Sequence, residues 1–212
     1  GQSLGAFAVQ GLRLEVIGDA NDYVGTGLSG GTIIVRPSAA AAFVAHDNTI
    51  IGNTVLYGAT SGKMFAAGQA GERLCVRNSG ATAVVEGAGT NACEYMTGGR
   101  VVILGEVGDN FGAGMTGGMA FVYDPDGTFR ERVNPASLEV MRIGTAHWEG
   151  ELKSLVETHA AATDSALAAR LLNEWDVEIG KFWQVVPTEI VARLDMPLSE
   201  DGGARADGDS PA

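Results

Sequence analysis

The sequence predicts an all-β solenoid, a β-helix of about six stacked turns, with a small helical appendage at its C-terminal end. Three observations lead to this fold class. Glycine is unusually frequent, with 31 glycines in 212 residues. The glycines recur about every 19 residues in two series, and those of the first series are followed by short segments rich in β-branched and other apolar residues. Such a period is typical of coils in which each turn buries its inner face against its neighbours.

Two series of glycines define the repeat, and in each series most steps are 18 to 20 residues long. One long step interrupts each series at the same place, and an insertion of about a dozen residues around Pro37–Asn48 accounts for both. The first series is Gly11, Gly31, Gly62, Gly80, Gly99 and Gly118, and the second is Gly18, Gly52, Gly71, Gly89, Gly108 and Gly127.

The segments after the first glycine series are predicted to be the strands of the coil, because they are short and rich in β-branched residues. At about 3.3 Å per residue, 19 residues trace a loop of roughly 60 Å, and successive turns stack about 4.8 Å apart. Helical repeats of 33 to 47 residues are too long for this period. A left-handed hexapeptide coil needs an aliphatic residue every six positions, a pattern the sequence does not show. The predicted strands are residues 12–17, 32–35, 81–85, 100–104 and 119–123.

The pattern changes after Asn134-Pro135, where apolar residues take up helical spacing. One helix is predicted around Leu152, Leu155, Val156 and His159, and a second around Leu167, Leu171, Leu172 and Trp175, capped by Asp164 or Ser165. Lys181–Val186 is predicted to be a strand, and Pro187 to open a last helical turn. The chain therefore divides into a β-helix domain (1–134), a mainly helical appendage (135–196) and a disordered acidic tail (197–212).

Charge and composition exclude several classes of function. The formal net charge is −12 with only 14 Lys and Arg, which argues against binding to nucleic acid. No apolar run approaches the roughly 18 residues of a membrane span, and no signal peptide is visible. Two cysteines do not make a secreted disulfide framework. We expect a cytoplasmic segment of a longer protein.

A dinucleotide-binding fingerprint, GxGxxG, occurs at Gly25–Gly30 and again at Gly112–Gly117. Nucleotide binding by this motif requires a helix directly after it, because the helix N-terminus holds the pyrophosphate. Both copies are followed by a predicted strand, and both occupy the same phase of the repeat. We therefore interpret the motif as part of the architecture.

A row of polar residues follows the second glycine series and is the one candidate site on the coil. Stacked side chains of this kind could bind a metal or a sugar, although Asp, Asn and Thr are also ordinary turn residues. No basic residue recurs in register to act as a lyase base. The row consists of Asp19, Asn53, Glu72, Thr90, Asp109 and Thr128.

The cysteine and histidine residues form no recognisable catalytic or metal motif. Cys75 and Cys93 are one repeat apart, which predicts two buried, reduced thiols stacked in adjacent turns. An iron–sulfur cluster normally needs more than two thiolates. His46, His147 and His159 share no motif and are expected to be structural or superficial. We assign no catalytic, cofactor-binding or metal-binding residue.

The sequence also resembles the C-terminal, GXGXG-repeat domain of the glutamate synthase large (α) subunit. The resemblance covers roughly residues 1–195, and only the segment Ala88–Ala92 departs from the Gly-Asp-His-Gly pattern usual before the cysteine. It is carried by Gly18-Asp19-Ala20-Asn21-Asp22-Tyr23-Val24-Gly25, Gly27-Leu28-Ser29-Gly30-Gly31, Ile51–Gly62, Arg77–Gly87 and Cys93-Glu94-Tyr95-Met96-Thr97-Gly98-Gly99.

The resemblance implies a right-handed β-helix that serves as a scaffold in a large amidotransferase. In that family an N-terminal domain with a nucleophilic cysteine hydrolyses glutamine. A central barrel with FMN and a 3Fe–4S cluster joins the released ammonia to 2-oxoglutarate and reduces the product to glutamate. The nucleophile and the cofactor ligands lie upstream of this domain, so none is assigned to a residue here. The implied partners are the other domains of the large subunit, together with a small electron-donating subunit or ferredoxin.

Two other classes of function stay open at the level of sequence. One is a stand-alone carbohydrate- or metal-binding β-helix that uses the polar row. The other is a pure assembly module. A Cys-led glutaminase and a barrel encoded upstream in the same reading frame would decide for the glutamate synthase interpretation.

Overall fold

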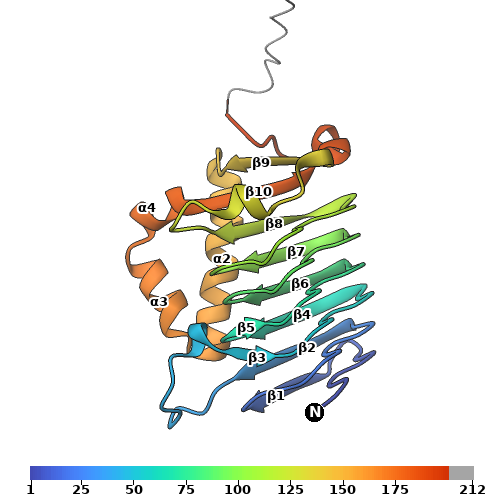
Figure 1. The fold of residues 1–212 in the computed structure, drawn as a ribbon, viewed down its shortest axis with the longest axis vertical. Coiled ribbons are helices and arrows are strands. Elements are labelled where there is room, and N and C mark those ends of the chain that lie inside the picture. The colour runs from blue at the N-terminus through green and yellow to red at the C-terminus, as the bar shows by residue number, and fades with distance from the viewer. Residues whose placement is uncertain (201–212) are drawn as a thin grey trace, which may run out of the picture.

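A computed structural model describes residues 1–200 of the chain, and its main feature is a parallel stack of six strands (Figure 1). Each strand belongs to one turn of a solenoid, so the predicted fold class of about six turns is confirmed. The strands are β1 (Arg13–Ile17), β2 (Ser29–Arg36), β4 (Ser61–Ala66), β6 (Ser79–Val85), β7 (Thr97–Ile103) and β8 (Gly117–Tyr123).

The register of these strands reproduces the predicted period. Arg13 pairs with Thr32, Lys63 with Thr82, and Arg100 with Met119, so each partner lies 19 residues further along the chain. The long step from β2 to β4 contains the predicted insertion, which includes the 3-10 helix η1 (Ala45–Asp47). The insertion projects from the coil, as the light-blue loop in Figure 1 shows.

A second, shorter ladder runs along another side of the coil. It consists of β3 (Thr49–Ile51), which pairs in parallel with β5 (Gln69–Ala70), and of single bridges that continue the row through Ala88 to Val107. Alternate residues of the strands point inward, which is the normal consequence of the two-residue period of a β-strand. The interior is filled by apolar side chains, among them Ile33, Val35, Met64, Val85, Cys93, Val101 and Ile103, all fully buried.

Between the two ladders, each turn contains a segment whose φ angle is positive at every second residue. In the fifth turn these residues are Asn91, Cys93 and Tyr95, with φ of 61°, 59° and 54°. Their N–H groups bond alternately to the turn before and the turn after. Cys93 donates to the carbonyl of Leu74 at 2.8 Å, and Tyr95 donates to that of Ala113 at 2.9 Å. We call this the alternating segment. Its backbone hydrogen bonds link each turn to both neighbouring turns.

The register corrects the alignment of the two glycine series. Gly98 pairs with Ser79 and Arg100 with Thr82, so a bulge sets two residues of β6, Gly80 and Ala81, against the single residue Gly99 of β7. Ala20 pairs with Ile51, so Gly52 faces Asn21 and not Gly18. Spacing alone cannot locate such single-residue slips, because bulges shift the register at the start of several strands.

Glycine is required at several strand starts because of close backbone packing, not because of a positive φ. A Cβ atom added at Gly80 would lie 2.2 Å from the carbonyl oxygen of Thr60 in the preceding turn. Gly80 itself has no left-handed conformation. Any side chain at this position must push two turns of the coil apart.

The last turn of the coil is closed by two antiparallel strands. β10 (Phe182–Pro187) pairs with β8, and β9 (Leu138–Arg142) pairs with β10 on its other side. The connection from β8 to β9 contains α1 (Phe129–Arg132) and η2 (Pro135–Ser137). Phe111, Phe129 and Leu138 fill the interior at this end.

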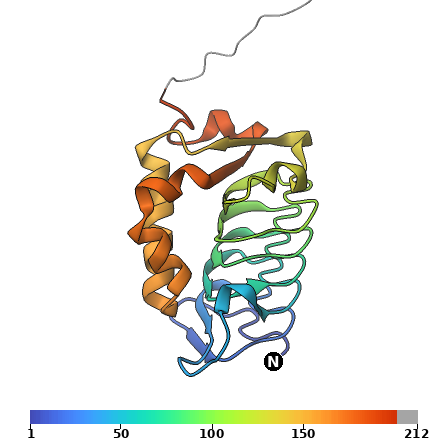
Figure 2. The same cartoon turned by 60° about the vertical axis from the view of Figure 1, so that its left-hand side comes forward.

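Two helices stand beside the coil as a second layer (Figure 2). They are α2 (Ala146–Thr163) and α3 (Ala166–Asn173), and the short elements α4 (Trp175–Glu178) and η3 (Ile179–Lys181) lead from them into β10. A second apolar core forms between this layer and the outer face of the strands. Its members include Ile34, Phe65, Val84, Val102, Phe121, Leu152, Val156, Leu171 and Phe182.

The remaining C-terminal predictions have mixed outcomes. Ser165 is the residue that caps the second helix, because its Oγ accepts the N–H of Ala168 at 3.0 Å. Pro187 precedes η4 (Thr188–Arg193), a 3-10 helix. The predicted tail begins too early, because Leu198 is buried and the carbonyl of Pro197 accepts the indole N–H of Trp148. The rest of that tail, residues 201–212, lies outside the described residues.

The predicted boundary at residue 134 stays a prediction. β9 and β10 come from the predicted appendage, yet both extend the sheet of the coil. Leu138 and Val185 also belong to the core of the coil. Within residues 1–200, no helix has the length and apolar character that crossing a membrane demands.

Candidate functional site

The structure brings four of the six polar-row residues into one row and leaves two outside it. Asn53, Glu72, Thr90 and Asp109 follow the row Ile51, Ala70, Ala88 and Val107 at the same corner of successive turns. Asp19 is displaced, because Asp22 is the residue that aligns with Asn53. Thr128 directly precedes α1, and its N–H bonds to the Asp124 carboxylate at 2.9 Å. Asp19 was wrongly assigned because of the register slip at Ala20 and Ile51, and Thr128 because the chain enters α1 at this point.

The row is held together by side-chain to backbone hydrogen bonds between turns. The Asp22 carboxylate accepts the N–H of Asn53 at 2.7 Å, and the Asn53 amide oxygen accepts the N–H of Glu72 at 2.8 Å. Asn110 donates to Asn91 at 2.8 Å in a parallel row. Among residues 1–200 no group of three His, Cys, Asp or Glu side chains is placed to hold a metal ion. The contacts of this row therefore connect the turns.

Cys75 and Cys93 lie in adjacent turns, as predicted, and both are free and fully buried. Both have left-handed backbone, with φ of 60° and 59°. Burial raises the pKa of both thiols well above the ordinary value, and the neighbouring Cys93 raises that of Cys75 further. Protonated thiols inside a closed apolar core are neither nucleophiles nor cluster ligands.

The two GxGxxG strings are followed by strands β2 and β8, as predicted. Gly25 and Gly27 in the first string, and Gly112 and Gly114 in the second, all have φ between 62° and 71°. They occupy the positions that Cys93 and Tyr95 occupy in the fifth turn. The motif thus supplies glycine where the alternating segment needs left-handed backbone.

The most constrained polar site of the described chain lies where the helices meet the coil. Glu86, directly after β6, is buried and faces the connection between α2 and α3. Its Oε1 accepts a short hydrogen bond from the Ser165 hydroxyl and lies 3.1 Å from Nε2 of His159. All three residues are buried, so a charged or strongly polar group of the coil is matched by donors from the helices.

The Glu86 cluster lacks the geometry of a catalytic triad. In a triad the hydroxyl must contact the imidazole, whereas here Ser165 and His159 both contact the same carboxylate oxygen. Within the described residues, Glu86 Oε2 and His159 Nδ1 have no hydrogen-bond partner. The arrangement can fix the position of the helices, and we assign it no proton transfer to a substrate.

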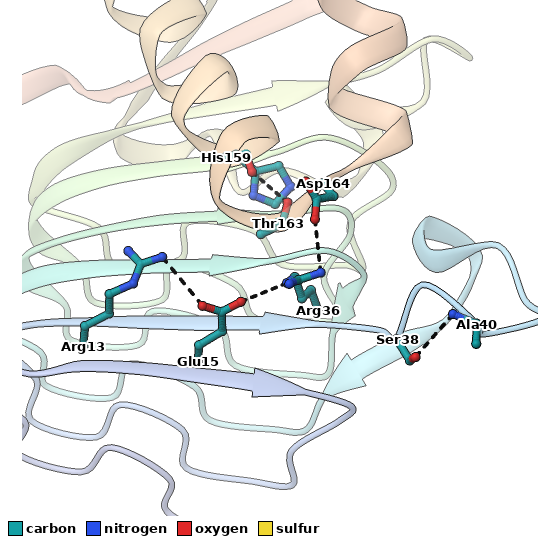
Figure 3. A network of polar contacts seen from close by, with 8 residues as sticks. All are labelled: Arg13, Glu15, Arg36, Ser38, Ala40, His159, Thr163 and Asp164. Carbon is teal, nitrogen blue, oxygen red and sulfur yellow. Dashed lines mark hydrogen bonds and ion pairs between the residues drawn. The ribbon is translucent and has the colours of Figure 1, made fainter.

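Ion pairs near this cluster tie further parts of the chain together (Figure 3). The Arg36 guanidinium at the end of β2 contacts Glu15 of β1 at 3.0 Å and Asp164, between α2 and α3, at 3.1 Å. Arg100 of β7 pairs with Glu151 of α2. Such partly exposed pairs contribute little energy individually, but they connect the helical layer to the second and fifth turns of the coil.

A second buried carboxylate closes the other end of the helical layer. Glu178 accepts a short hydrogen bond from the Tyr123 hydroxyl of β8 and one from Lys181 at 2.9 Å. Burial alone would raise the pKa of Glu178, but its hydrogen bonds with Tyr123 and Lys181 outweigh burial and lower that pKa below its ordinary value. Burial and the Glu178 hydrogen bond raise the pKa of Tyr123.

An open groove of about 400 Å³ runs between α3, the insertion and the last two turns of the coil. Its lining includes His46, Glu106, Arg132 and Arg170. Arg132 lies 3.8 Å from Asp109, and Arg170 lies 3.9 Å from Glu178, so both cations already face carboxylates. We assign the groove no ligand.

The partnership of Glu86 with Ser165 and His159 was not predicted from the sequence, from which His159 was expected to be structural or superficial. A weak signal exists, because Glu86 directly follows a strand and lies between buried residues, and because His159 lies on the apolar stripe of α2. The partnership joins residues 73 and 79 positions apart, so no local pattern could predict it.

The fold and the site define a glycine-rich β-solenoid in which the polar clusters of the described residues join structural elements. The family model described as the GXGXG motif matches residues 1–188. The chain belongs to this GXGXG family, as its resemblance to the repeat domain of glutamate synthase large chains predicted.

Curated relatives agree with this assignment. The glutamate synthase [NADPH] large chain of Azospirillum brasilense is 64% identical over 93% of this chain and 13% of its own length. The ferredoxin-dependent glutamate synthase of Pyropia yezoensis is 52% identical over 88% of this chain and 12% of its own. The glutamate synthase [NADH] of Schizosaccharomyces pombe is 48% identical over 97% and 10%. The chain therefore spans about an eighth or less of these relatives.

Proposed function

We propose that this chain is the scaffold domain of a glutamate synthase large chain. In this role it holds a glutaminase domain and a synthase domain in register around an ammonia path, while glutamine and 2-oxoglutarate react elsewhere in the enzyme. The proposal rests on the family membership together with one structural observation. Every turn of the coil is bonded to its neighbours by backbone, from the second turn to the last strand.

Continuous backbone bonding gives the coil the stiffness that a spacer needs. Six turns at about 4.8 Å each form a body roughly 30 Å tall. Its interior is closely packed with apolar side chains, and closely packed interiors transmit strain instead of absorbing it. A flexible linker of the same length would let the distance between two active sites fluctuate and would open an ammonia path to water.

The helical layer supports the scaffold role by bracing the coil from one side. α2 packs against β2, β4, β6 and β7, so it spans four turns. The buried Glu86 cluster fixes its C-terminal end, and the Arg100–Glu151 pair contacts its N-terminal third. Bending of the coil would have to break these contacts together.

The cofactors and the electron donor of the proposed enzyme belong to its other parts. The two thiols of this chain are enclosed in the core, so they do not fit a 3Fe–4S cluster. Relatives include proteins named for NADPH, NADH and ferredoxin. We propose that FMN and the cluster reside in the remainder of the large chain, with a small subunit or ferredoxin as the electron donor and the cytoplasm as the location.

A second candidate function is binding of a sugar or a metal at the polar row, because Glu72 and Asp109 are exposed at one corner of the coil. Replacing both by Ala in the full-length enzyme separates the two candidates. The scaffold role predicts glutamate formation within about twofold of the unmodified enzyme, since neither side chain is buried. Loss of turnover in a protein that still folds would favour a site on the polar row.

A further inference from the structure

The insertion between β2 and β3 has a sequence typical of a helix, but it is not folded as one. Residues 38–46 are Ser-Ala-Ala-Ala-Ala-Phe-Val-Ala-His. Alanine is the strongest helix former, and serine is a preferred N-cap residue. In this stretch the structure contains only η1, the 3-10 helix that begins at residue 45. Such a disagreement between local preference and local structure is expected at functional or strained segments.

Both ends of this stretch already form hydrogen-bonded turns. The Ser38 hydroxyl accepts the N–H of Ala40 at 3.3 Å, as an N-cap does (Figure 3), and the Ser38 carbonyl accepts the N–H of Ala41 at 2.9 Å. At the other end, Asp47 donates its N–H to the carbonyl of Val44 at 3.2 Å. Between the two turns the chain is unwound, and Val44 is extended with φ of −79° and ψ of 118°. A continuous helix therefore requires rewinding of only a few residues.

A hollow of about 400 Å³ lies between the insertion and the connection from α2 to α3. Ala67 and Leu167, both buried, form apolar parts of its wall, and Glu86 of the buried cluster also lines it. The hollow is therefore suited to an apolar side chain, and whatever fills it covers the Glu86 cluster.

The insertion contributes residues with helical spacing to the lining of the hollow. Ala39, Phe43 and His46 are among the residues that line it. They lie at positions i, i+4 and i+7, which share one face of an α-helix. Winding residues 39–46 into a helix would therefore keep these three side chains on the side of the hollow.

The two ends of the insertion are held beside the hollow, while its middle is free. Arg36, the last residue of β2, contacts Asp164 between α2 and α3 at 3.1 Å (Figure 3). Near the other end, the Gln69 side chain donates to the carbonyl of His46 at 2.8 Å. Phe43, between these anchors, is 52% exposed. An apolar ring is thus tethered next to an apolar hollow that it does not fill.

We infer that the insertion, residues 37–48, is a strap that closes over this hollow. On closing, residues 39–46 wind into one helix, and the Phe43 ring enters the hollow against Ala67 and Leu167. A helix this short is marginal in water by itself and needs an apolar surface to pack on, which the hollow provides. The closed strap covers Glu86, so it sets how firmly the helical layer is held. Closure depends on this geometry alone and not on the scaffold role.

The occupant of the hollow is the strap itself and not a separate partner, because the strap is tethered at both ends. Tethering makes closure an intramolecular step with a high effective concentration, whereas a separate partner must first associate. Phe43 also lines the hollow already, so closure needs a rearrangement within the strap and no movement of the coil or the helices.

Amide hydrogen exchange of Phe43 and Val44 reports closure. Neither N–H has an acceptor among residues 1–200, whereas a helix over residues 39–46 would provide the carbonyls of Ala39 and Ala40. We expect both amides to exchange at least about fivefold slower than in an unstructured peptide of the same sequence. Exchange at the peptide rate would overturn the inference. Amides of β4 and β6 show in the same experiment that the coil is intact.

Two variants of neighbouring residues test whether the Phe43 ring is the anchor. In Phe43→Ala the ring is absent, so the Val44 amide should exchange within about twofold of the peptide rate. Val44→Ala is the matched control, because Val44 is also 52% exposed but points about 100° away from Phe43 around the helix. In this control the Phe43 amide should stay at least as slow as in the parent.

Loss of the slow exchange in both variants, or in neither, would show that the Phe43 ring is not what closes the strap. Slow exchange that depends on protein concentration would also overturn the inference, because a second copy of the chain would then cover the insertion.

Discussion

Replacing Glu86 by Ala is expected to loosen the helical layer from the coil. The carboxylate of Glu86 is buried and receives the Ser165 hydroxyl and the His159 imidazole on one oxygen. Removing it leaves both partners buried without this carboxylate and deletes the Cγ, Cδ, Oε1 and Oε2 atoms, which opens a cavity beside Ala67 and Leu167.

The expected loss of unfolding free energy is about 3–5 kcal/mol. Removing one partner of a buried, charge-assisted contact typically costs this much, and each orphaned donor contributes about 1–3 kcal/mol of it. For a chain of this size, 1 kcal/mol shifts Tm by about 2–4 °C. The Tm of the variant should therefore fall by roughly 6–20 °C.

Thermal unfolding followed by circular dichroism, together with amide exchange, checks this expectation. Amides of α2 and α3 should exchange faster than in the parent, while those of β6 and β7 change less. Glu106→Ala is the matched control, because Glu106 is an exposed carboxylate at the same side of the next turn, and its loss should stay within about 0.5 kcal/mol. If both variants unfold at the same temperature, the cluster does not hold the helices.

Three further outcomes are expected. Cys75 and Cys93 should resist a thiol reagent at pH 8 and react together only on unfolding, since burial raises the pKa of both; rapid labelling of the native protein would show that the core is open. The lowered pKa of Glu178 stabilises the fold above the pKa that this carboxyl has in the unfolded chain, and this contribution is lost as the pH falls through the lower folded value. Glu178→Gln should therefore flatten the acid side of the stability–pH curve, and an unchanged curve would contradict this. Substitution of Glu72 or Asp109 by Ala should change the unfolding free energy by less than about 0.5 kcal/mol in denaturant titrations.

The repeat could be predicted from sequence because every turn has the same backbone geometry and therefore the same residue requirements. Strand segments, close backbone packing and left-handed positions recur with the turn, so glycine recurs as well. Single-residue slips in register could not be predicted, because Gly80 and Gly98 are required by packing between turns alone, whereas Gly99 is required by both packing and a positive φ. Composition does not distinguish these two reasons for a glycine.

In the alternating segments, the positions of glycine do not identify every residue with left-handed backbone. Leu56, Cys75 and Arg77 adopt left-handed backbone without being glycine, with φ of 58°, 60° and 55°. The hydrogen bonds to both neighbouring turns offset the local strain of about 1 kcal/mol or more at each such residue. The Glu86 cluster was missed for a related reason, because its partners meet only through the packing of α2 on the coil.

The most direct test of the scaffold role is the ratio of glutamine hydrolysed to glutamate formed by the full-length enzyme. Gly80→Val forces a side chain against the Thr60 carbonyl and separates two turns, whereas Gly150→Ala, in open space on α2, leaves the coil untouched. We predict that soluble Gly80→Val enzyme hydrolyses glutamine in excess of the glutamate it forms, and that Gly150→Ala keeps the parent ratio. A folded Gly80→Val enzyme with a perturbed coil, shown by faster amide exchange in β4 and β6, and an unchanged ratio would contradict the scaffold role.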